Sequence, residues 1–140
     1  MDIQAKYVEN RTFLARGDSN HWVPVDTSGG TDAASTPMEM VLFGLATCSG
    51  LDVVSILEKR RVQLDDMEIH ANAERADEHP RVYTKIHLKY SFTSPDLTEK
   101  DADRAISLSQ DKYCSVSKML ESTADITYEF EIKRTPVPVE

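Results

Sequence analysis

Residues 36–61, TPMEMVLFGLATCSGLDVVSILEKRR, decide how the rest of the chain must be arranged. They predict a helix that is apolar on nearly every side, and such a helix lies in a core or a membrane. The uninterrupted apolar run, 40–46, is too short to cross a bilayer and is bracketed by Glu39 and Asp52. We therefore expect a central core helix that presents the sulfur of Cys48 from inside the protein.

The start of this helix carries its own signals. Thr36 is a good N-cap, Pro37 suits the first helical position, and Glu39 follows three residues after the cap. Together they form a T-x-x-E capping box. Capping explains Glu39 without any chemistry; the alternative is a catalytic carboxylate nine residues before Cys48.

The composition is that of one globular domain spanning residues 1–140. The formal net charge of -8 argues against nucleic-acid and anionic-membrane partners, which require a basic face. The N-terminal sequence MDIQAKYVEN lacks the features of a signal peptide. We expect a cytoplasmic protein, whose cysteines stay reduced unless they are catalytic, redox-sensing or metal-bound.

Strand patterns surround the helix. Alternation and turn signals predict strands at 3–9, 12–15, 21–25, 67–75, 82–92 and 126–132, and helices at 98–108 and 115–120. The first three strands form an antiparallel meander with Pro24 at an edge. The run 82–92 is the clearest strand, with one face made by Val82, Thr84, Ile86, Leu88, Tyr90 and Phe92.

This order predicts an α+β fold in which antiparallel sheets wrap a buried helix. One small sheet covers only one side of that helix. The remaining apolar side predicts a partner subunit, most simply in a twofold homodimer.

Cys48 has two interpretations. It is either a buried small hydrophobe or a thiolate nucleophile. A thiolate requires a nearby cation, and Arg11 and Arg16 of the meander are the candidates. Gly44 and Gly50 would leave room beside the sulfur for another backbone or a substrate.

Cys114 lies 66 positions beyond Cys48, near a predicted helix start that would favour a thiolate. If the two thiols meet in space, Cys114 can resolve a sulfenic acid on Cys48 as a disulfide. The alternative for the pair is two buried small hydrophobes.

No cofactor or metal is expected. The chain has no CxxC pair, no phosphate-binding glycine loop and no dinucleotide fingerprint. Its histidines, His21, His70, His79 and His87, do not form a ligand spacing.

Two blocks of sequence carry a resemblance to a known family. The first is STPMEMVL at 35–42 with Cys48 and LDVVSIL at 51–57; the second is KYCSV at 112–116, preceded by LS at 108–109 and followed by ML at 119–120. The chain resembles the OsmC/Ohr family (osmotically inducible protein C and organic hydroperoxide resistance proteins), most closely its YhfA-like branch.

The resemblance implies an intertwined homodimer whose sheets wrap two long central helices, with two active sites at the subunit interface. It implies a thiol-dependent peroxidase for organic hydroperoxides, with Cys48 peroxidatic and Cys114 resolving. An external dithiol would reduce the disulfide. The helix side chains Met38, Leu42, Phe43 and Leu45 would supply an apolar lining for an organic peroxide.

The sequence departs from the characterised peroxidases at one position. They have a glutamate directly after the helix-opening proline, whereas this chain has Met38 there and Glu39 next. The family's activating arginine matches Arg11 best and Arg16 second. The predicted catalytic set is therefore Cys48, Cys114, Arg11 and Glu39.

Two alternatives stand beside peroxidase activity. One is a non-peroxidatic protein that binds a small ligand or senses redox state on the same scaffold. The other is a redox-inert dimer with two buried cysteines.

Overall fold

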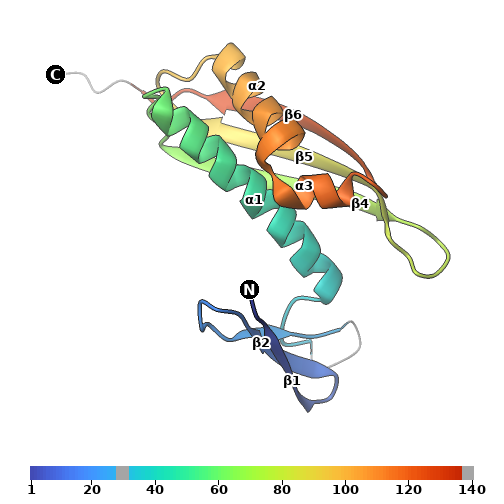
Figure 1. Ribbon diagram of the computed structural model, residues 1–140. Coiled ribbons are helices and arrows are strands. Elements are labelled where there is room, and N and C mark those ends of the chain that lie inside the picture. Colours follow the sequence, from blue (N-terminus) through green and yellow to red (C-terminus); the bar gives the residue numbers. More distant parts are fainter. Residues whose placement is uncertain (28–31, 137–140) are drawn as a thin grey trace. The chain divides into compact units, whose positions relative to one another are not determined.

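The computed structural model describes residues 1–27 and 32–136 (Figure 1). Contacts divide the chain into two compact units, Met1–Phe43 and Gly44–Glu140. The long helix α1, Pro37–Lys59, begins in the first unit and contributes most of its length to the second. The single-domain organisation expected from the sequence stays a prediction.

The first unit contains the predicted antiparallel meander. Its strands are β1 (Gln4–Glu9), β2 (Thr12–Arg16) and β3 (Val23–Val25), paired in that order. Asn10 and Arg11 form the tight turn between β1 and β2, with positive φ angles of 46° and 66°. Pro24 lies on the edge strand β3, where its missing N–H breaks no ladder.

The capping box at the start of α1 is confirmed. The Glu39 backbone N–H donates to Thr36 Oγ1 at 3.2 Å, and the Thr36 N–H donates to Glu39 Oε1 at 3.1 Å. The helix ends two residues before the predicted end, since Arg61 has a φ of 59°, the left-handed conformation with which helices commonly finish.

The second unit is built on a sheet of three strands, ordered β4-β5-β6. These strands are β4 (Asp66–Arg75), β5 (Tyr83–Thr93) and β6 (Asp125–Lys133). β4 and β5 are antiparallel, but β5 and β6 run parallel, so the prediction of purely antiparallel sheets is wrong for that pair. Parallel neighbours require a long crossover. It consists of helix α2 (Glu99–Leu108), the π-helical turn η1 (Ser109–Tyr113) and helix α3 (Ser115–Leu120).

The central strand β5 buries one face, as its alternation predicts, from Ile86 to Phe92. Before Ile86 the prediction is wrong, because Tyr83 is buried whereas Val82 is exposed. A register shift beside Arg75, the partner of Tyr83, adds a residue to the pairing and inverts the alternation there.

The core of the second unit lies between this sheet and the helices on one of its faces (Figure 1). Its fully buried members are Leu45, Val53 and Leu57 of α1, Leu88, Tyr90 and Phe92 of β5, and Ala102, Ala105 and Ile106 of α2. The other side of α1 is open, since Leu51 is 71% exposed.

The whole of α1 is long and apolar enough to cross a membrane, with a mean hydropathy of 1.9 over its most apolar stretch. The run 40–46 is too short to span a bilayer, but the full helix of 23 residues is not. The buried face of α1 gives the better argument. Leu45, Val53 and Leu57 are buried within the second unit, together with the polar Ser49, as in the core helix of a folded protein.

Candidate active site

The two cysteines meet in the second unit. Cys48 lies half-buried on α1, and Cys114 is buried at the N-cap of α3. Their sulfur atoms lie within 4.8 Å of each other, and a carboxylate oxygen of Asp52 lies within the same distance of both. Disulfide formation requires sulfurs about 2.05 Å apart, so small side-chain and backbone movements would bring the two thiols together.

Cys114 is positioned by the π-helical turn η1, which directly precedes it. Its backbone N–H donates to the Ser109 carbonyl at 2.8 Å, closing that turn. Its sulfur accepts the backbone N–H of Ser117 at 3.4 Å. Short π-helical turns occur frequently at functional sites, where they re-aim a side chain.

The environment of Cys114 favours the protonated thiol. The pKa of Cys114 is raised to about 11, chiefly by burial; a hydrogen bond with Cys48 and the charge of Cys48 add to the rise, and the hydrogen bond from the Ser117 N–H opposes it. The expectation that the helix start would make Cys114 thiolate-like is therefore wrong, because removal from water outweighs one backbone N–H.

A buried polar network connects α1 to η1 beside the two sulfurs. Ser49 Oγ is hydrogen-bonded to the Tyr90 hydroxyl and lies 2.9 Å from Ser109 Oγ, and it accepts from Gln110 Nε2 at 3.1 Å. Ser117 Oγ donates to Gln110 Oε1 at 2.7 Å. Among the described residues, no buried side-chain nitrogen or oxygen lacks a partner. Since an unsatisfied polar group here would be costly, the network fixes η1 on α1.

This network ends at Asp52. Ser109 Oγ lies 3.0 Å from Asp52 Oδ2 and has a single hydrogen to donate. A carboxylate is the stronger acceptor, so that hydrogen goes to Asp52, and Ser49 then donates to Ser109. Burial raises the pKa of Tyr90, which keeps its hydroxyl protonated and able to donate into the network.

Asp52 was missed as a site residue by sequence reasoning. The signal was present, because residues four apart lie on the same face of a helix, and Asp52 follows Cys48 by four. A single carboxylate beside an apolar run is, however, equally explained as its polar boundary. Ser109 and Gln110 could not be found this way, because no local pattern marks them.

The remaining predicted residues lie in the first unit. Glu39 belongs to the capping box, and Arg11 is exposed on the β1–β2 turn. Arg16 donates to Asn20 Oδ1 at 2.8 Å and stacks over Trp22, 4.8 Å from the ring centroid. Whether Arg11 or Glu39 acts on Cys48 stays a prediction.

The two glycines beside Cys48 have different surroundings. A Cβ on Gly50 would lie 3.0 Å from Ile69 Cδ1, so Gly50 allows α1 to approach β4 and does not make room at the sulfur. A Cβ on Gly44 would meet no atom within 4 Å. Leu45, expected in the peroxide lining, is fully buried in the core instead.

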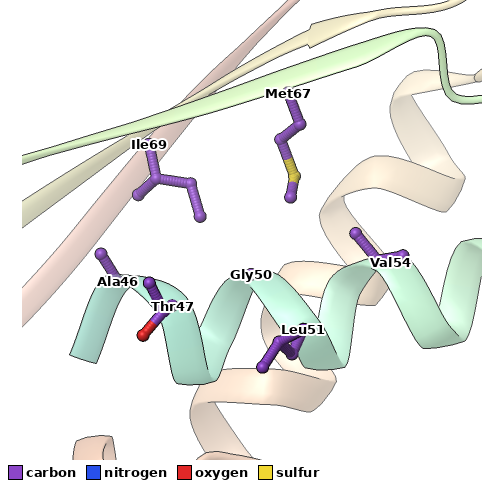
Figure 2. A pocket seen from close by; sticks show the side chains of 7 residues that line it. All are labelled: Ala46, Thr47, Gly50, Leu51, Val54, Met67 and Ile69. Atoms are coloured by element: carbon purple, nitrogen blue, oxygen red, sulfur yellow. The ribbon is translucent and has the colours of Figure 1, made fainter. Parts of the chain in front are cut away.

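An apolar groove of about 520 Å³ lies between α1 and β4, on a different side of α1 from Asp52. Figure 2 shows Met67 and Ile69 pointing from β4 towards Gly50, and Leu51 pointing away from the sheet. The lining residues are Ala46, Thr47, Gly50, Leu51, Val54, Met67 and Ile69.

Comparison with known proteins gives a consistent result. The family described as OsmC-like protein matches residues 29–129 of this chain. Protein YhfA of Escherichia coli strain K12 is 43% identical over 132 residues, which cover 94% of this chain and 98% of the relative.

Solved structures show the same fold. An OsmC-like protein from Mycoplasma pneumoniae has a TM-score of 0.82 at 18% identity, covering 94% of this chain and 96% of that one. The organic hydroperoxide resistance protein OhrB of Bacillus subtilis has a TM-score of 0.64 at 15% identity, covering 93% and 96%.

Proposed function

Because this chain belongs to the OsmC-like family, we propose that it is a cysteine-based peroxidase that reduces organic hydroperoxides in oxidative-stress defence. One observation carries the proposal: a half-buried thiol and a fully buried thiol lie within 4.8 Å of each other. A peroxidatic cysteine must be reached by substrate, whereas a resolving cysteine need only reach its partner. The solved relative named for organic hydroperoxide resistance supports this substrate class.

The proposed reaction has three steps. The Cys48 thiolate attacks the terminal peroxide oxygen, the O–O bond breaks, and the alkoxide leaves as an alcohol after protonation. The Cys114 sulfur then attacks the sulfur of the Cys48 sulfenic acid; Cys114 loses its proton and water leaves. An external dithiol reduces the resulting disulfide by thiol–disulfide exchange.

The protonated state of Cys114 suits its proposed part. A buried thiol competes poorly for peroxide, since the thiolate is the nucleophile. We therefore assign the first attack to Cys48. Arg11 is the proposed activating cation and Glu39 its proposed carboxylate partner. Arg16 is the weaker candidate, because Asn20 and Trp22 already engage it.

We also propose that the protein works as a cytoplasmic homodimer. The strand β1 is exposed along its whole length, and the outer side of α1 exposes Leu51. A three-stranded sheet needs a covered apolar face for independent stability. A second copy in contact with each of these surfaces would supply that cover.

The test is peroxide consumption with an organic and an inorganic peroxide. Cys48→Ser should abolish turnover of cumene hydroperoxide, whereas Cys114→Ser should react once and then overoxidise to the sulfinic acid, visible by mass spectrometry. Arg11→Ala should slow the first attack more than Arg16→Ala does. Equal consumption of cumene hydroperoxide by the wild type and Cys48→Ser would sink the proposal.

The apolar groove favours a second candidate, a protein that binds a small apolar ligand. Its volume of about 520 Å³ is in the range of ligand sites. Native mass spectrometry of the purified protein separates the two. A retained small molecule, together with no peroxide turnover, would favour ligand binding.

A further inference from the structure

The reduced cysteine pair shares its site with a carboxylate. Ligand atoms of Cys48, Asp52 and Cys114 all lie within 4.8 Å of one another. Two thiolates and a carboxylate are a donor set that suits a borderline-soft divalent metal such as zinc. The peroxidase chemistry proposed above gives no part to Asp52, so this carboxylate is unexplained by it.

The separations fit a metal with little adjustment. Zinc binds thiolate sulfur at about 2.3 Å, so two sulfurs on one tetrahedral zinc lie about 3.8 Å apart. The two sulfurs therefore need to close by about 1 Å at most. Cys48 and Asp52 lie one turn apart on α1, so one rigid helix supplies two of the ligands.

Two ligands are oriented from behind by hydrogen bonds. Ser109 Oγ donates to Asp52 Oδ2 at 3.0 Å, and the Ser117 N–H donates to Cys114 Sγ at 3.4 Å. Such outer partners are a regular feature of metal sites, where they fix ligand orientation. Here Ser109 is itself held by the buried network through Ser49.

The proposed site borders a cavity at Asp52. A cavity of about 120 Å³ touches Asp52 and is lined further by Ser55, Ile56, Lys59 and Tyr113. It lies beside the carboxylate end of the proposed site. Two thiolates and Asp52 carry three negative charges, of which a divalent cation would leave one, and Lys59 provides a positive charge on the cavity wall.

We propose that Cys48, Asp52 and Cys114 of the reduced protein form a binding site for one thiophilic divalent cation of the zinc class, with an open fourth position. Three protein ligands and one open position are the arrangement of exchangeable and catalytic zinc sites. The site depends only on the reduced thiols and Asp52, and so it stands whether or not the protein is a peroxidase. A Cys48–Cys114 disulfide removes two of the three ligands, which restricts binding to the reduced state.

Cobalt is the probe, added to untagged, fully reduced protein without peroxide. We expect one Co²⁺ per chain, with sulfur-to-cobalt charge-transfer absorption in the near ultraviolet that disappears when Zn²⁺ is added in competition. Cys48→Ser and Cys114→Ser should each lose most of that absorption. Disulfide-oxidised protein should show none.

Asp52→Asn tests the third ligand, with Asp111→Asn on the exposed side of η1 as its control. Asp52→Asn should weaken Zn²⁺ affinity by more than about tenfold, and Ser109→Ala by about 10- to 100-fold. Asp111→Asn should leave affinity unchanged. Thermal unfolding of each variant without metal establishes that it is folded.

Three results would each overturn the proposal. They are the absence of stoichiometric cobalt binding to the reduced wild type, equal affinity in Asp52→Asn and Asp111→Asn, and equal binding by the disulfide form. The first removes the site, the second removes Asp52 as a ligand, and the third shows that the metal lies elsewhere.

Discussion

Ser49→Ala should destabilise the protein by about 2 kcal/mol. The Ser49 side chain is fully buried, and its Oγ is hydrogen-bonded to the Tyr90 hydroxyl, Ser109 Oγ and Gln110 Nε2. Each buried hydrogen bond contributes about 1 kcal/mol net. Alanine is the better helix former by about 0.5 kcal/mol, which offsets part of that loss.

The partners of Ser49 keep the cost moderate. Ser109 retains Asp52 at 3.0 Å, and Gln110 Nε2 still donates to the Tyr90 hydroxyl at 3.3 Å. Each partner therefore keeps one hydrogen bond, which limits the cost, although the Tyr90 O–H loses its acceptor.

Urea unfolding of the reduced, metal-free protein measures the effect. With a slope of about 2 kcal/mol/M, a loss of about 2 kcal/mol lowers the midpoint by about 1 M at an unchanged slope. Ser55→Ala is the control, because Ser55 is exposed on the same helix and gains the same helix propensity. Its free energy of unfolding should stay within about 0.5 kcal/mol of that of the wild type.

Equal midpoints for Ser49→Ala and Ser55→Ala would refute the reasoning. They would mean that the network does not hold η1 against α1. The closeness of the two sulfurs would then need another cause.

Two further predictions concern pH and assembly. Burial raises the pKa of Tyr90 and of Tyr128, so the folded state holds these protons more tightly than the unfolded chain does. The stability that these two groups contribute is fully present below about pH 10 and is lost as the pH rises further. Urea midpoints should therefore fall above about pH 10, and fall less steeply in Tyr128→Phe than in the wild type. An equally steep fall in both proteins would contradict this. Leu51→Asp should convert the proposed dimer to a monomer, measured by light scattering. Met119→Asp, at a similarly exposed position on α3, should leave the dimer intact. A dimer unaffected by Leu51→Asp would place the interface elsewhere.

The features that sequence predicted correctly are set by neighbours in the chain. Thr36 and Glu39 cap a helix through residues three apart, and the Asn10–Arg11 turn needs only its own two residues. The alternation from Ile86 to Phe92 follows from one buried face. Each depends on a few consecutive residues, so it can be predicted without the rest of the chain.

The features that sequence did not predict are set by distant pairing. The exposed Val82 and buried Tyr83 follow from a bulge opposite β4, and the parallel pairing of β5 with β6 follows from where the crossover returns. The π-helical turn before Cys114 has no recognised local signature. The two strand features cannot be predicted from local sequence, because the partner strand sets the register of a strand.

The candidate site divides in the same way. Cys48 stood out because a sulfur in an apolar helix is conspicuous, and the pairing with Cys114 came from resemblance to a family. Asp52 lies one helical turn after Cys48, but its carboxylate indicates a site only when Cys114 is known to lie beside it.

Charge links the proposed peroxidase to the proposed metal site. Asp52 and two thiolates would place three negative charges within 4.8 Å, and like charges near 4 Å repel by about 1 to 4 kcal/mol per pair where water still reaches them. A positive charge nearby is therefore needed to stabilise the site whenever its thiols ionise. An arginine and a metal ion would meet that need differently, because an arginine remains after oxidation whereas the metal loses its thiolate ligands to the disulfide. A peroxidase activated by Arg11 should accordingly be inhibited by zinc, since the metal occupies the sulfur that must attack the peroxide, and Asp52→Asn should relieve that inhibition.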